Sequence, residues 1–129
     1  MPPTFENPPA VPAPLAHYAH VARAGNLLYI SGQLAVDAHG QAVGLGDARA
    51  QARQVWANLL GILQHYGLGP AAIVKSTTFI THPAYRGPVG EARDEVFTRP
   101  PYPANTLVVV QALAEPYYLV EIEAVAMTD

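Results

Sequence analysis

The segment Tyr102-Pro103-Ala104-Asn105-Thr106 leads into the apolar run Leu107-Val108-Val109-Val110, and Leu119-Val120-Glu121-Ile122-Glu123-Ala124-Val125 follows after a short connection. The β-branched run and the later alternation predict two strands joined by a loop. Because successive side chains point to opposite faces, one face carries Val120, Ile122, Ala124 and Ala126, and the other carries Glu121, Glu123 and Val125. If another subunit covers the acidic face, Glu121 is a partly desolvated carboxylate suited to chemistry; if the face meets water, Glu121 is an ordinary solvated acid.

The first half of the chain predicts a hairpin and a long helix. Two short strands are expected over residues 20–31, joined by a tight turn at Gly25-Asn26. Ser31-Gly32-Gln33 ends the second strand, where a glycine permits close approach of a ligand or another chain. Asp47 suits the N-cap of a helix that ends at Gly67, because apolar residues recur between them at three- and four-residue steps.

The second half predicts one more strand and one shorter helix before the C-terminal pair. Residues 73–80 are rich in β-branched side chains and predict a strand. A weaker apolar pattern predicts a helix over residues 89–97, which Arg99-Pro100-Pro101 must stop. The order strand, strand, helix, strand, helix, strand, strand indicates an α+β fold with both helices on one face of the sheet. The other face is left uncovered, which favours packing against copies of the same chain in a cyclic oligomer.

Length and composition limit the classes of protein. A chain of 129 residues predicts a single domain, and residues 1–15, with six prolines, read as an extended, poorly hydrogen-bonded arm ahead of a domain over residues 16–129. Only 13% of residues are charged and the net charge is −3, which favours self-association and disfavours a nucleic-acid binder. The sequence shows no signal-peptide pattern and no apolar run of ~20 residues, so we expect a cytoplasmic protein with no membrane contact.

Several short motifs, in this order and spacing, carry a resemblance that covers nearly the whole chain. They are Ala24-Gly25-Asn26, Ser31-Gly32-Gln33, Gln51 with Asn58-Leu59, Val74-Lys75-Ser76-Thr77, Pro103-Ala104 and Val120-Glu121-Ile122-Glu123-Ala124. The sequence resembles the Rid family of reactive intermediate deaminases, also called the YjgF family. The resemblance implies a chorismate-mutase-like (YjgF-like) α+β fold, a homotrimer whose sheets form a central barrel, and small-molecule clefts between adjacent subunits.

The resemblance also implies an activity and a set of site residues. Family deaminases hydrolyse enamines and imines to a carbonyl compound and ammonia, without a metal or cofactor. A glutamate matching Glu121 positions the attacking water, while a backbone amide near Ser31-Gly32 and a tyrosine matching Tyr18 line the cleft. The five histidines show no spacing typical of metal ligands, so no metal site is predicted.

The sequence departs from the family pattern at the cleft. Asn105 stands where family deaminases carry an arginine that binds the substrate carboxylate, and a neutral amide cannot replace that charge. Gly90 and Arg93 also differ from the residues usual at their positions. Asn105 is therefore expected to contact a neutral group of the ligand or to lie in a disused site, and Arg86, Arg93 or Arg99 either restores a positive charge or is a solvated surface group.

Two classes of function follow. The leading prediction is a hydrolytic deaminase of an enamine- or imine-type molecule with altered specificity. The alternative is a non-enzymatic trimer that binds a small metabolite or a partner protein through the same clefts. Endoribonuclease activity, with which the family has also been credited, is disfavoured by the acidic charge balance.

Overall fold

The computed structural model describes residues 2–129, so Met1 of the predicted arm lies outside the described residues. Residues 2–129 form six strands, two α-helices and two single-turn 3₁₀-helices. In order these are β1 (Thr4–Glu6), β2 (Val21–Ala24), β3 (Leu27–Gln33), α1 (Ala48–His65), η1 (Pro70–Ala72), β4 (Ile73–Ile80), η2 (Pro83–Tyr85), α2 (Arg86–Val96), β5 (Ala104–Val109) and β6 (Val120–Met127). Neither α-helix of this part of the chain combines the length and the apolarity that a membrane span requires.

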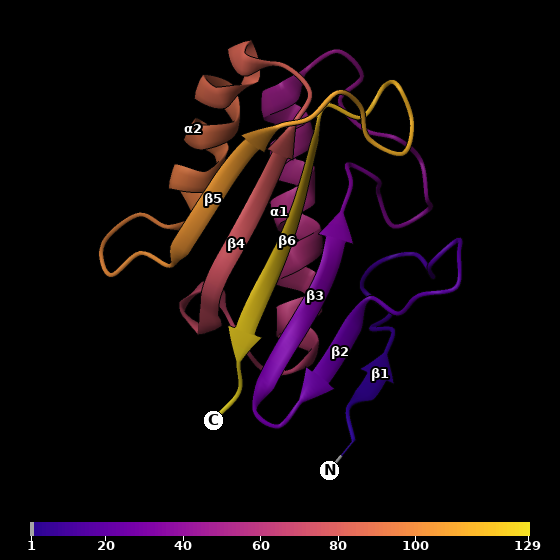
Figure 1. Cartoon of the computed structure of the whole chain (residues 1–129), viewed down its shortest axis with the longest axis vertical. Helices are drawn as coiled ribbons and strands as arrows, with labels where there is room; N and C mark the ends of the chain where they lie inside the picture. The colour runs from indigo at the N-terminus through magenta and orange to yellow at the C-terminus, as the bar shows by residue number, and fades with distance from the viewer. Residues whose placement is uncertain (1) are drawn as a thin grey trace.

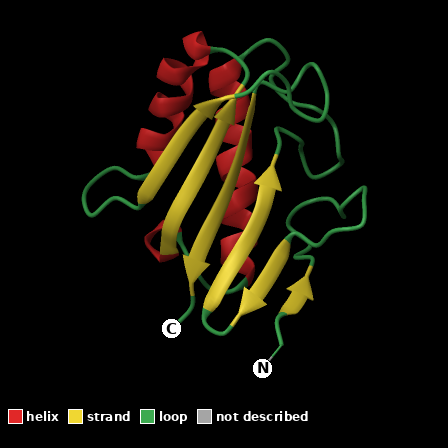
Figure 2. Cartoon of the chain, in the orientation of Figure 1, coloured by secondary structure: helices red, strands yellow, loops and turns green. Residues whose placement is uncertain are grey.

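The strands form one mixed sheet in the order β1-β2-β3-β6-β4-β5. Neighbouring strands are antiparallel except for β4 and β5, which run parallel through the α2 crossover. Both α-helices lie behind the sheet in Figure 1 and leave the front face bare, as Figure 2 also shows. The predicted α+β architecture is confirmed, with β5 at a free edge of the sheet.

The core lies between α1 and the middle of the sheet. Leu59, Ile62 and Leu63 of α1 are fully buried, as are Leu28 of β3 and Ile122 of β6. Burying one such side chain contributes about 1.5–3 kcal/mol, so this layer sets the position of β6 relative to the helix. The alternation predicted for β6 is confirmed, because Val120, Ile122, Ala124 and Ala126 are buried while Glu121 and Glu123 point to the bare face.

The long helix agrees with its sequence signals. The Asp47 side chain accepts a hydrogen bond from the Ala50 amide, and Gly67 takes a left-handed φ of 70° beyond the last turn. The second helix begins three residues earlier than expected, at Arg86, and ends at Val96. Pro88 falls in its first turn, where a missing N–H costs no intrahelical bond, so the proline permits the earlier start.

The N-terminal segment contains a strand that the sequence did not predict. Thr4–Glu6 pairs antiparallel with β2, because these residues lie between proline pairs and keep their backbone donors. Glu6 also accepts a hydrogen bond from the Tyr66 hydroxyl at 2.8 Å and lies 3.5 Å from Arg23. The Tyr66 hydrogen bond lowers the pKa of Glu6, and burial raises the pKa of Tyr66 to about 12. These contacts fasten the start of the chain to the end of α1.

Candidate functional site

Glu121 lies on the bare face of the sheet, against an irregularity in the neighbouring strand. The β3–β6 register shifts between Ile30 and Gln33, so Ser31-Gly32 forms a bulge beside β6. A Cβ placed on Gly32 would lie 1.9 Å from Glu121 Oε2. The carboxylate therefore occupies space that only a glycine leaves open, and the structure brings together Glu121, Ser31 and Gly32 as a group.

The carboxylate of Glu121 is partly removed from water. Burial raises its pKa above the ordinary value, and the negative charge of Glu123 on the same face raises it further. Among residues 2–129, no hydrogen bond or ion pair holds this carboxylate. Glu121 is thus a carboxylate of increased basicity with free acceptor positions.

The two residues that follow Tyr18 contact Ser31 through their backbone carbonyls. Ser31 Oγ donates to the Ala19 carbonyl at 2.7 Å, and the Ser31 amide donates to the His20 carbonyl at 2.8 Å. The Tyr18 ring packs edge-on against His20, with centroids 6.1 Å apart, and remains about half exposed. Glu121, Ser31 and Gly32 therefore lie together, and the backbone contacts of residues 19 and 20 bring the segment that carries Tyr18 next to Ser31.

Asn105, the fifth predicted site residue, lies on the opposite side of the sheet. It pairs in register with Ser76 of β4, whose side chain is buried on the helix side. One amide orientation satisfies both neighbours: Oδ1 accepts from Arg93 Nη1 at 2.9 Å, and Nδ2 donates to Ser76 Oγ at 2.9 Å. In the reverse orientation Ser76 Oγ donates to Oδ1, but the amide NH₂ then faces the guanidinium, donor against donor. The first orientation is therefore the favourable one, because both ends of the amide have a partner.

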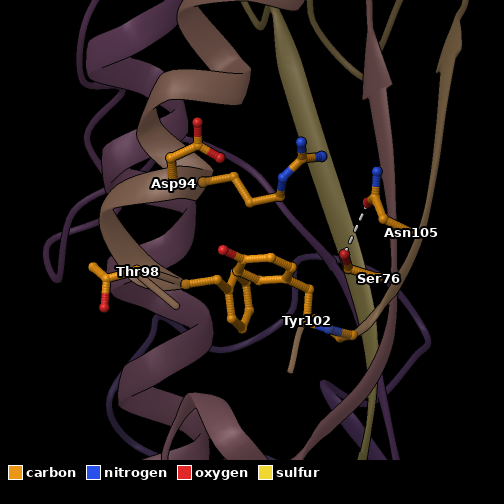
Figure 3. Close-up of a pocket in the computed structure, with 8 residues that line it drawn as sticks. Ser76, Asp94, Thr98, Tyr102 and Asn105 are labelled. Carbon is orange, nitrogen blue, oxygen red and sulfur yellow. Dashed lines mark hydrogen bonds between the residues drawn. The ribbon is translucent and has the colours of Figure 1, made fainter. Parts of the chain in front are cut away.

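A cavity of about 530 Å³ opens beside this pair, between α2 and the start of β5. Its walls are Ser76, Arg93, Asp94, Phe97, Thr98, Tyr102, Pro103 and Asn105. In Figure 3, Asp94 and Thr98 lie on the helix side, Ser76 and Asn105 on the sheet side, and the Tyr102 ring lies between them. A second hollow, of about 480 Å³, shares Arg93, Asp94 and Asn105 and includes Arg86 and Gly90.

The structure distinguishes the three arginines that the sequence left open. Arg93 reaches Asn105, Arg86 lines the second hollow without contacting Asn105, and Arg99 lines a different hollow near Pro101. Sequence reasoning did not select Ser76 as a neighbour of Asn105, because their contact depends on the parallel register of β4 and β5. Within residues 2–129, no three acidic or histidine side chains converge as a metal site would require.

A six-stranded mixed sheet with two helices on one face is the architecture of the YjgF-like, chorismate-mutase-like fold. The model of the family described as Endoribonuclease L-PSP matches residues 9–128. The chain belongs to this family, the YjgF or Rid family, and has its chorismate-mutase-like fold.

Relatives support this assignment over nearly the full length. The chain is 32% identical to the 3-aminoacrylate deaminase RutC of Acinetobacter baylyi, covering 98% of each chain. It is 26% identical to the 2-iminobutanoate/2-iminopropanoate deaminase of Dermatophagoides farinae, covering 94% of this chain and 93% of that one. The solved structure of the Rid family protein YyfA from Yersinia pestis superposes with a TM-score of 0.91 at 30% identity, covering 98% of this chain and 99% of that one.

Proposed function

We propose that the protein is a hydrolytic deaminase of an enamine- or imine-type small molecule, with a specificity that differs from that of arginine-bearing relatives. The observation that carries the proposal is the Glu121 carboxylate, which lies against Gly32 with a raised pKa and no partner among residues 2–129. A carboxylate in this state is suited to accept a proton from a water molecule near neutral pH.

The reaction needs one acid–base group and a defined place for the substrate. Addition of water across a C=N bond gives a carbinolamine, whose C–N bond then breaks to leave a carbonyl and release ammonia. Glu121 would take a proton from the attacking water and return it to the leaving nitrogen. Ser31, Gly32 and Tyr18 would bound the substrate on the same face.

We propose that the complete site forms between two copies in a homotrimer. Glu121 and Asn105 point to opposite faces of one sheet, so their side chains cannot contact the same small molecule within a single chain. Asn105 lies on β5, a free edge strand that can pack against the bare sheet face of a neighbouring copy. Tyr29, Val108 and Met127 are exposed on that face, which favours its burial against another copy.

The names of the relatives agree with this class of reaction. RutC of Acinetobacter baylyi is a 3-aminoacrylate deaminase, and the Dermatophagoides farinae relative is a 2-iminobutanoate/2-iminopropanoate deaminase. These substrates are an enamine and two imines, and all three carry a carboxylate. The fold and the acid on β6 are compatible with the same hydrolysis here.

The test follows imines released by an amino-acid oxidase, with semicarbazide as a competing trap. Active protein lowers semicarbazone formation and raises free keto acid. We expect Glu121→Gln to abolish the effect and Glu123→Gln, which changes the more exposed acid on the same face, to retain it. Equal activity of both variants refutes the role of Glu121. Absence of turnover by the wild type on every imine tested favours the non-enzymatic binding function.

A further inference from the structure

Arg93 differs from the arginines of the neighbouring helix in its partners. Arg49 of α1 pairs with Glu91, and Arg53 pairs with Glu95 at 2.7 Å, so two acids of α2 are already neutralised. Within residues 2–129, Arg93 forms no such ion pair, and its side chain contacts the Asn105 amide instead. The helix therefore presents a half-buried cation whose charge is not cancelled by a bonded carboxylate.

Asn105 holds this guanidinium in a fixed place. Its Oδ1 accepts from Arg93 and its Nδ2 donates to Ser76 Oγ, which is itself buried. Both ends of the amide are thus used within the chain, and asparagine here orients a cation. A guanidinium has five N–H donors, so the bond to Asn105 leaves donors for a ligand in the adjoining cavities.

We propose that Arg93 is the residue that binds the anionic group of the substrate and that Asn105 positions it, so the substrate is an imine or enamine that carries a carboxylate. This inference rests on the proposed function and names its substrate class. The Arg93 guanidinium, on α2, contacts the end of the Asn105 side chain, on β5. The positive charge that position 105 lacks is therefore supplied by α2. Planar guanidinium binds carboxylate through two parallel hydrogen bonds, which fix orientation as well as affinity.

Asp94 lines the same cavity as Arg93 and places a negative charge there. It lies on the helix side, across from Ser76 and Asn105 (Figure 3). A bound carboxylate is repelled by this neighbour while it is attracted by Arg93. We therefore expect Asp94→Asn to tighten binding of an anionic ligand and to leave an uncharged ligand unaffected.

The experiment measures binding of 2-oxobutanoate and of its uncharged amide, 2-oxobutanamide, by calorimetry or by NMR titration of the full chain. Arg93→Gln should raise the Kd for the acid about 10- to 100-fold and leave the Kd for the amide unchanged. Arg23→Gln is the matched control, because it removes the same charge from β2, beside Glu6, and Arg23 lines neither of the two hollows. Exchange of the two residues, Arg93→Asn with Asn105→Arg, should restore binding of the acid.

Binding and turnover separate the two proposals. Glu121→Gln should turn over no imine but should still bind 2-oxobutanoate more tightly than 2-oxobutanamide. If the wild type hydrolyses no imine but Arg93→Gln binds 2-oxobutanoate more weakly than the wild type, the proposed hydrolysis is overturned and the anion site is supported. The anion site is overturned if Arg93→Gln binds the acid as tightly as the wild type, or if the wild type binds the amide as tightly as the acid.

Discussion

Replacement of Gly32 by alanine tests whether the place of the Glu121 carboxylate matters for catalysis. The added Cβ would lie 1.9 Å from Oε2, 2.8 Å from Cδ and 3.0 Å from Cγ of Glu121. An ordinary contact begins at 3.4 Å, so Oε2 must withdraw by about 1.5 Å or the side chain must adopt another rotamer. The obstacle is the end of a flexible side chain, so the fold can accommodate the methyl group.

The expected effect is therefore large on activity and small on stability. Misplacing a catalytic group by about 1 Å costs on the order of 100-fold in rate, or about 2.7 kcal/mol in the activation barrier. We expect kcat/KM for imine hydrolysis to fall by about this factor, while Tm changes by less than about 3 °C. The imine assay and thermal unfolding measure the two quantities on the same preparations.

Two comparisons establish that the loss acts through Glu121. Gly69→Ala is the matched control, because a Cβ there meets nothing within 4 Å and the glycine needs no left-handed backbone. The double variant Gly32→Ala with Glu121→Ala should be no less active than Glu121→Ala alone. The reasoning is refuted if Gly32→Ala keeps full activity, or if it lowers activity further once Glu121 is absent.

Three further predictions concern stability. Burial and the charge of Glu123 raise the folded-state pKa of Glu121, so the wild type should lose stability as pH rises through that pKa and the carboxyl ionises. In urea unfolding, the free energy of unfolding of Glu121→Gln should therefore increase relative to that of the wild type between pH 4 and pH 7. Tyr66→Phe should lower the free energy of unfolding, measured in urea at pH 7, by about 1 kcal/mol, because it removes the hydrogen bond from the Tyr66 hydroxyl to Glu6. Since that bond lowers the Glu6 pKa, the loss should shrink as pH falls through it; a pH-independent loss would contradict this. Gln51→Ala should cost about 2–4 kcal/mol in the same assay, because the buried amide bonds three backbone groups; a loss below about 1 kcal/mol would refute this.

Much of the fold follows from local patterns in the sequence. The period-two alternation of β6 and the Asp47 cap with the Gly67 end of α1 agree with the structure, because each depends on residues close together in the chain. The order of elements also predicted both helices on one face. The strand at Thr4–Glu6 was not predicted, since its stability depends on pairing with β2 and on the distant Tyr66.

The candidate site likewise has features that the sequence determined and contacts that only the tertiary structure decided. The sequence by itself determined that this chain has an acid on a sheet face, a glycine near the end of a strand, and no arginine at position 105. Tertiary structure alone decided that Glu121 fills the space beside Gly32, that Asn105 faces the other side of the sheet, and that Arg93 meets Asn105. Each of these contacts joins segments far apart in sequence, so it depends on strand register and helix packing, which local side-chain patterns do not encode.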